Sequence, residues 1–243
     1  MVERTRHARI AVDRSPFGAH VLLLAAAIAI AAILAGCGGS GEASLPNRFD
    51  ANRAWRLVEL QLASGQRPAG SPRLRRLAVK LRPLLPHGRF EALPGEPGLR
   101  NVVGTLPGRR PGIVVGAHYD TLASPRGFVG ANNGAAGSAI ALDYVGNRGL
   151  FLPREGTSSE ALWSRLVAAA NEVGDERFFS REAGPAIEDD HTPFLRAAVP
   201  SVDLIDWSYP GHTLADGLDK LSRQSLDAVG ETVVQLVSEL REE

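Results

Sequence analysis

The sequence is poor in cysteine and has no excess of charge of either sign. Because Cys37 is its only cysteine, the chain cannot form a disulfide within itself. Its 27 Lys and Arg residues balance its 27 Asp and Glu residues, so nothing attracts it to nucleic acid by charge alone. Internal repeats are also absent, and only a short polar tether at residues 37–48 is of low complexity. We therefore expect no nucleic-acid partner, and we expect a monomer.

A long hydrophobic run is also lacking. The apolar run Val21–Ala35 follows an arginine-rich flank, and it is shorter than the roughly 20 residues that span a bilayer. A basic flank, a short apolar run and small residues at its end are typical of an export signal. The closing Leu-Ala-Gly-Cys resembles the bacterial lipobox, in which the cysteine is lipidated.

This pattern predicts a location for the protein. We expect residues 1–36 to be a lipoprotein signal peptide and Cys37 to be lipidated. The protein is then exported to the cell envelope and anchored by lipid to the outer face of the cytoplasmic membrane. An uncleaved membrane anchor is the alternative.

Residues 49–243 are expected to form one domain, because 44% of the sequence is hydrophobic and can bury a core. Apolar residues at helical spacing alternate with short apolar runs, which is typical of an α/β fold. We expect an open, mostly parallel mixed sheet with helices on both faces. The predicted helices are 50–63, 71–81, 158–173, 191–198 and 221–240, and the predicted strands are 89–93, 100–106, 113–117, 139–145 and 200–205.

Histidine and acidic residues collect near the ends of these strands. His118, His191 and His212 lie at or near predicted strand ends or on short loops, with Asp143 and the run Glu188-Asp189-Asp190 nearby. In open α/β sheets, the loops beyond the carboxyl ends of the strands form the ligand crevice. A set of histidines and aspartates on such loops matches the ligands that zinc uses in proteins.

Several motifs occur in an order that is typical of one family. Together they cover most of the predicted domain, and the chain resembles metallopeptidase family 28, the zinc aminopeptidases, especially its glutaminyl-peptide cyclotransferase branch. The run Glu-Asp-Asp-His-x-Pro-Phe-Leu favours that branch, because typical aminopeptidases have a single acid before this histidine. The matching stretches are Arg67–Pro72, Arg100–Val103, Gly116–Thr121, Phe128–Asn132, Leu142–Gly146, Glu188–Leu195 and Tyr209–Thr213.

The resemblance implies roles for single residues. It assigns metal binding to His118, Asn133, Asp143 and His212, where Asn133 replaces the aspartate that the family shares between two metals. It assigns catalysis to Asp143 and Asp189, as the acidic network of the cyclotransferases. Asp190 and His191 are assigned to substrate binding. The implied cofactor is zinc, and the implied substrates are peptide N-termini.

One part of the family pattern is missing. The family needs two adjacent glutamates on a loop ahead of Asp143, one for zinc and one as general acid/base, but no glutamate occurs from Gly134 to Asp143. Two parallel strands also need a crossover of a dozen or more residues, and the stretch Gly137–Leu142 passes from helix-like into strand-like sequence with no turn residue. We therefore expect that a central element of the fold is missing and that zinc affinity is doubtful.

Three functional hypotheses follow. The first is a zinc-dependent glutaminyl-peptide cyclotransferase, impaired by the missing glutamates. The second is an exported zinc aminopeptidase, which would release free amino acids instead of cyclising an N-terminal glutamine. The third is a catalytically inactive family member or the product of a damaged gene. By lineage the protein is an enzyme, while the absent glutamates argue against full activity.

Overall fold

The computed structural model describes residues 47–108, 112–131, 140–209 and 211–242. The chain divides into two units, Met1–Gly41 and Glu42–Glu243, and all described residues belong to the second. The predicted signal peptide, Cys37 and Asn133 lie outside the described residues. Within the part that is described, no helix is both long enough and apolar enough to cross a membrane.

Two capped helices open the domain. Helix α1 (Ala51–Leu62) begins after Asp50, whose side chain accepts a hydrogen bond from the backbone N–H of Arg53 at 2.8 Å. Helix α2 (Pro72–Leu81) begins after Ser71, which caps the backbone N–H of Leu74 in the same way at 3.1 Å. Both caps and both helix ends agree with the sequence predictions to within two residues.

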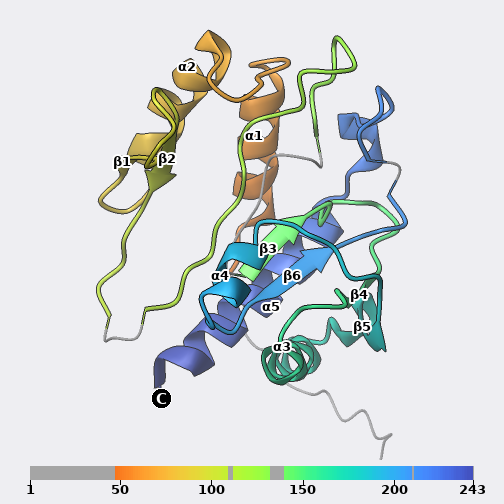
Figure 1. The fold of residues 1–243 in the computed structure, drawn as a ribbon. Coiled ribbons are helices and arrows are strands. Elements are labelled where there is room, and N and C mark those ends of the chain that lie inside the picture. The colour runs from red at the N-terminus through yellow and green to blue at the C-terminus, as the bar shows by residue number, and fades with distance from the viewer. Residues whose placement is uncertain (1–46, 109–111, 132–139, 210, 243) are drawn as a thin grey trace, which may run out of the picture. The chain divides into compact units, whose positions relative to one another are not determined.

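The strands pair in three two-stranded pieces (Figure 1). Strands β1 (Arg89–Ala92) and β2 (Arg100–Val103) form an antiparallel hairpin. The other two pairs are parallel, so the described strands include both parallel and antiparallel pairs but no single sheet that mixes them. The parallel pairs are β3 (Ile140–Asp143) with β6 (Val202–Ile205), and β4 (Leu152–Arg154) with β5 (Phe179–Ala183). The sequence analysis did not predict β4 and β5, because each is short and only the first residue of each is buried.

The predicted strand 113–117 is not formed. Among the described residues, its sheet-like contacts are a bridge between Gly116 and Ala141 and a 3.3 Å hydrogen bond from the N–H of Ile140 to the carbonyl of Val114. Ile113, Val114 and Val115 are 38%, 50% and 46% exposed. An apolar run alone predicts burial, but burial also needs a partner strand or helix on each side. The described strands do not form one uninterrupted sheet. This agrees with the expectation that a central element of the fold is missing.

The core lies between the parallel strands and two helices, α3 (Glu160–Glu172) and α5 (Arg223–Glu242), which pack on each other. Along β6, alternate side chains face opposite sides, so Val202 and Leu204 pack into this core while Asp203 faces away from it. On that other side Asp203 meets His191, which begins the short helix α4 (Thr192–Arg196). The fully buried core side chains include Leu152, Leu166, Val202, Leu204 and Leu236.

Candidate active site

His118 lies on the loop that follows the irregular segment 113–117, and its side chain is 27% exposed. Its Nδ1 atom lies 3.3 Å from Oδ1 of Asp120. Burial lowers the pKa of His118, but the hydrogen bond to Asp120 and the negative charges of Asp143, Asp120 and Asp190 outweigh burial, so its pKa is raised. These carboxyl groups are therefore close enough to act on the imidazole together.

Asp143 is the last residue of β3, where the strand reaches the crevice. The N–H of Tyr144 donates to its Oδ1 at 2.9 Å, and Tyr144 itself has a φ of 53°, which turns the chain sharply at this point. Burial raises the pKa of Asp143 to about 7, with further raising by the charges of Asp189 and Asp190 and an opposing effect from His118. A carboxyl group with such a pKa exchanges protons readily near neutral pH.

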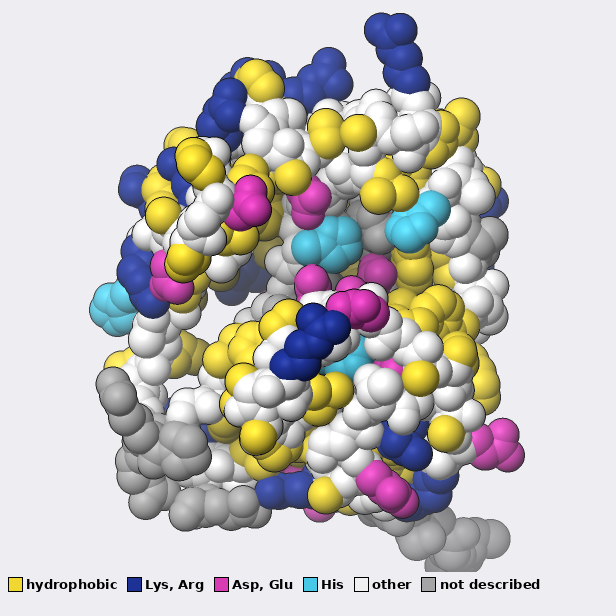
Figure 2. Space-filling view, viewed as in Figure 1, with side chains coloured by type: hydrophobic (Ala, Val, Ile, Leu, Met, Phe, Trp, Pro, Cys, Tyr) yellow, Lys and Arg dark blue, Asp and Glu magenta, His cyan; other side chains and the backbone are white. Residues whose placement is uncertain are grey.

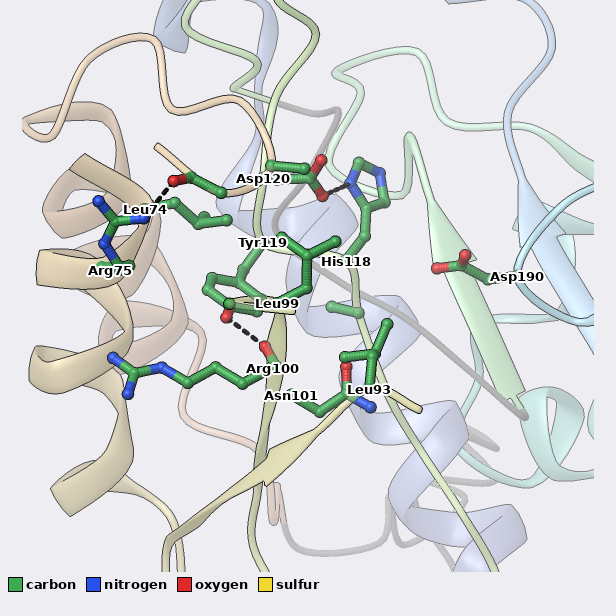
Figure 3. A pocket seen from close by; sticks show the side chains of 14 residues that line it. Leu74, Arg75, Leu93, Leu99, Arg100, Asn101, His118, Tyr119, Asp120 and Asp190 are labelled. Atoms are coloured by element: carbon green, nitrogen blue, oxygen red, sulfur yellow. Dashed lines mark hydrogen bonds and ion pairs between the residues drawn. The ribbon is translucent and has the colours of Figure 1, made fainter. Parts of the chain in front are cut away.

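Asp189 and Asp190 occupy the turn before α4. The N–H of Asp189 donates to Oγ1 of Thr192 at 3.0 Å, and the N–H of Asp190 donates to Oδ1 of Asp189 at 2.7 Å. These bonds fix the turn so that Asp190 lies across the crevice from His118 (Figure 3). Burial and the charges of Asp189 and Asp120 raise the pKa of Asp190, while the charge of His118 lowers it.

A cavity of about 270 Å³ opens beside these groups. Its polar side holds His118, Asp120 and Asp190, and in the space-filling view acidic and histidine side chains gather around a hollow (Figure 2). Its other side is formed by α2 and by the β1–β2 hairpin with its loop, as Figure 3 shows. The pocket is therefore acidic at one end, and its other end combines three leucines with two arginines and an asparagine. The side chains on the second side are those of Leu74, Arg75, Leu93, Leu99, Arg100 and Asn101.

Arg67, from the turn between α1 and α2, holds the site loops in place. Its side chain is fully buried. Its Nε donates to the carbonyl of Tyr119 at 2.9 Å, and its Nη1 donates to the carbonyl of Val129 at 2.7 Å. One cation thus joins the loop that carries His118 to the glycine-rich loop after it. The sequence motif Arg67–Pro72 was noticed, but nothing in the sequence indicated that its arginine is buried.

The structure places His191 away from the pocket lining. Its side chain is fully buried. Its Nε2 lies 3.0 Å from Oε2 of Glu155, and its Nδ1 lies 3.5 Å from Oδ2 of Asp203. The substrate-binding role implied for His191 stays a prediction. Sequence analysis missed Glu155 and Asp203, although a lone aspartate inside the apolar strand Val202–Ile205 is a signal of a buried polar partner.

His212 lies on the loop after β6 and is exposed. Its ring lies 6.5 Å from the ring of Phe128 and 6.1 Å from that of Tyr144, measured between centroids. A Cβ atom placed on the preceding Gly211 would overlap the hydroxyl of Tyr144. Tyr144 thus occupies the space beside Gly211 where a side chain would otherwise project.

The described residues do not fit a zinc ion. Among them, no three His, Cys, Asp or Glu side chains come together in a way that could hold a metal. His118, Asp143 and His212 all lie within the described residues, so the ligand set implied by the resemblance does not converge. The fourth implied ligand, Asn133, lies outside them. Zinc sites in proteins usually have three or four protein ligands.

The sequence matches the profile of peptidase family M28 over residues 101–146 and 144–237. The chain belongs to peptidase family M28. A comparison with functionally curated proteins gave no significant match.

Solved structures show that the chain has the fold of this family. A glutaminyl cyclase from an Acidobacteriales bacterium has a TM-score of 0.66 and 21% identity, over 85% of this chain and 99% of that one. The glutaminyl cyclase of Porphyromonas gingivalis has a TM-score of 0.63 and 21% identity, over 80% and 99%. A Zn-dependent exopeptidase from Parabacteroides distasonis has a TM-score of 0.60 and 18% identity, over 78% and 98%. The predicted α/β fold is therefore confirmed.

Proposed function

We propose that this M28 domain binds the N-termini of peptides in the manner of the glutaminyl cyclotransferase branch, with weak cyclisation activity. The observation that supports this most is the set of carboxyl groups around His118. Asp120 and Asp190 line the pocket, and the charges of Asp143 and Asp189 act on the same groups. Two acidic side chains at one end of the pocket, with two more whose charges act on the same groups, complement the ammonium group of a peptide, and the leucines at the other end can contact its side chains.

The chemistry of this branch needs one proton transfer. The N-terminal amine nitrogen bonds to the side-chain amide carbon of glutamine, the bond from that carbon to the amide nitrogen breaks, and ammonia leaves. One proton passes from the attacking nitrogen to the leaving nitrogen. In our proposal Asp190 holds the N-terminal ammonium group, which first loses one proton to solvent so that its nitrogen can attack. Asp143 and Asp189 then carry the second proton from the attacking nitrogen to the leaving nitrogen.

Zinc would polarise the amide carbonyl in such a reaction. The described residues do not fit that ion, and the sequence lacks the family's glutamate pair between Gly134 and Asp143. We therefore propose that zinc binds weakly and that turnover is impaired. General acid/base catalysis contributes roughly 10²–10⁴-fold to the rate. We therefore expect the absence of the family's general acid/base glutamate to lower kcat measurably.

Two alternatives give different products. An aminopeptidase, which the likeness to a Zn-dependent exopeptidase favours, would release free amino acids from peptide N-termini. A catalytically inactive member would bind peptides without changing them. The damaged-gene hypothesis predicts a protein that neither folds cooperatively nor binds peptide.

The test is binding and turnover with one glutamine peptide and its N-acetylated form. Calorimetry should detect binding of the free peptide but not of the acetylated one, because acetylation removes the ammonium charge. Asp190→Asn should raise the Kd of the free peptide about tenfold, because it removes one charge-assisted contact with the ammonium group. Equal binding of both peptides would contradict the proposal.

The same protein is then titrated with zinc beside an Asn133→Asp variant. The variant should bind zinc more tightly and still cyclise slowly, with ammonia release as the measurement. Turnover as fast as in an intact family member would overturn the proposed impairment. Release of free amino acids would instead identify the aminopeptidase.

We also propose that the domain is exported and held at the envelope by a lipid on Cys37. The basic flank, the apolar run Val21–Ala35 and the lipobox-like residues that end at Cys37 support this location.

A further inference from the structure

A buried chain of three titratable side chains lies beneath the acidic turn. Glu155 follows β4, His191 precedes α4, and Asp203 lies on β6, and all three are fully buried. The imidazole of His191 lies between the two carboxyl groups, at 3.0 Å from Oε2 of Glu155 and 3.5 Å from Oδ2 of Asp203. None of the three lines the pocket, so the proposed reaction does not use them directly.

Glu155 has the partners that a carboxylate needs. Its oxygens accept hydrogen bonds from the N–H of Thr157 and of Ile187, both at 2.9 Å, and from the hydroxyl groups of Thr157 and Ser158. Burial would raise the pKa of Glu155, but these donors outweigh burial and lower it. Glu155 is therefore ionised, and Nε2 of His191 must carry a hydrogen in order to donate to it.

Asp203 is the opposite case. Neither of its carboxyl oxygens has a hydrogen-bond partner among the described atoms, and neither does Nδ1 of His191. A bare buried carboxylate is costly, because it loses water and gains no donor. A proton on Oδ2 of Asp203 removes the buried charge and lets this hydroxyl donate to Nδ1 of His191, so that two of the three unpartnered atoms pair and only Oδ1, now uncharged, has no donor.

We propose that Asp203 is protonated in the folded protein, shares its proton with His191, and so helps the Glu155–His191–Asp203 chain to position Asp189 and Asp190 at the crevice. Burial raises the pKa of Asp203 to about 8, and the negative charges of Asp189, Asp143, Glu155 and Asp190 raise it further in the same direction. These four carboxyl groups and the imidazole of His191 are the titratable groups that act on it from the surrounding elements.

The chain reaches the crevice through the backbone. His191 directly follows Asp189 and Asp190 in the sequence. The position of its buried ring therefore fixes the position of the turn that these two residues form before α4. The N–H of Thr192, on the other side of His191, donates to the carbonyl of Asp189 at 2.8 Å and closes the turn. Glu155, His191 and Asp203 are therefore positioning residues. Only this last step, from position to peptide binding, rests on the proposed function.

Protonation gives a pH dependence with a defined sign. The folded-state pKa of Asp203 lies above its unfolded value of 3.8, so the folded protein holds the proton more tightly. Its contribution to stability is complete at low pH and is lost as the pH rises towards about 8. The unfolding constant of the wild type, divided by that of Asp203→Asn, should therefore rise about tenfold per pH unit between pH 5 and pH 7.

Asp206, just beyond the end of β6, provides the matched control. It is also fully buried, but its carboxyl oxygens accept hydrogen bonds from Asn147, Phe151 and Ser208. Asp206→Asn should destabilise the protein by a similar factor at each pH, because it removes an acceptor that is already satisfied. A constant ratio for Asp203→Asn over this range would overturn the proposed protonation.

The second measurement is nitrogen NMR of the His191 ring in the intact protein. At pH 6, Nε2 should carry the hydrogen and Nδ1 should accept one, and Asp203→Asn should keep this tautomer because the amide can still donate. Hydrogens on both ring nitrogens at pH 6 would identify a charged His191–Asp203 ion pair and refute the shared proton. If the ring behaves as expected and Glu155→Gln leaves binding of the glutamine peptide unchanged, the positioning role is wrong.

Failure of the positioning role can be distinguished from failure of the proposed function. If the wild type binds no peptide, the proposed function fails while the NMR and stability results still decide the protonation of Asp203. If the wild type binds peptide, Glu155→Gln should weaken binding several-fold without changing the preference for the free over the acetylated peptide.

Discussion

The core between α3, α5 and the parallel strands differs from the crevice beside it in what holds each together. The core is formed by apolar side chains such as Leu166 and Leu204, both with no exposed surface. Around the crevice, loops are held by buried polar side chains, above all Arg67 and the Glu155–His191–Asp203 chain. Apolar packing tolerates small shifts, whereas each buried polar group needs a particular partner. The crevice half is therefore more sensitive to single substitutions.

The largest effect is expected from Arg67→Met. It removes a buried cation and leaves the carbonyls of Tyr119 and Val129 without their donors. We expect the free energy of unfolding to fall by roughly 3–5 kcal/mol, as measured by denaturant titration. Gln66→Ala is the control from the same turn, because Gln66 contacts the next stretch of loop at Leu122 and Pro125. It should cost about 1 kcal/mol. Equal losses would show that the arginine has no special role.

In the core, Leu166→Ala should cost about 2–5 kcal/mol, because it removes buried methyl groups and leaves a cavity. The matched substitution at the irregular edge is Val114→Ala, where the side chain is 50% exposed. It should change stability by less than about 0.5 kcal/mol. A large loss at Val114 would mean that this segment is packed against something in solution, and would contradict the exposed edge.

A smaller effect, on charge, is expected from Asp120→Asn. The substitution removes two of the effects that raise the pKa of His118, the hydrogen bond and the charge of Asp120, so the pKa of His118 should fall. Proton NMR titration of the imidazole measures the change. Asp50→Asn is a distant acidic control, since Asp50 caps α1, and it should leave the His118 titration unchanged. A rise in the pKa of His118 would contradict the arrangement of charges in the crevice.

The smallest effect on folding is expected from Cys37→Ala. The free energy of unfolding of the domain should not change, because Cys37 precedes the predicted domain. The cellular result should be large, since unlipidated protein leaves the membrane fraction or remains unprocessed. Fractionation and the mobility of the precursor on gels are the measurements. An unchanged distribution would contradict lipidation at this residue.

The sequence predicted the capped helices and the strands β1, β2, β3 and β6 because their periodicity and caps are local signals. It did not predict β4 and β5, which are short and half-exposed and depend on each other for hydrogen bonds. It wrongly predicted a strand at 113–117, because burial of that run depends on a neighbour that the sequence pattern cannot supply.

The site divides in the same way. His118, Asp143, Asp189 and Asp190 lie near enough for their charges to act on one another, while their roles stay predictions. His212 does not join the first two in a metal site, and His191 lies below the surface. Motif spacing identifies residues of a site, but the partners Glu155 and Asp203 come from distant parts of the chain, and only the tertiary structure brings them to His191.

The exposed segment Ile113–Val115 has a consequence for how the protein behaves at high concentration. It presents three β-branched residues in a row, and the described contacts of residues 113–117 with β3 are one hydrogen bond at Val114 and one bridge at Gly116. Natural proteins usually shield such edges with charge, proline or a covering helix, because an open edge pairs with the edge of another molecule. Solubility, and not the free energy of folding, should therefore limit the concentration of this protein. A single lysine in place of Val114 should raise that limit.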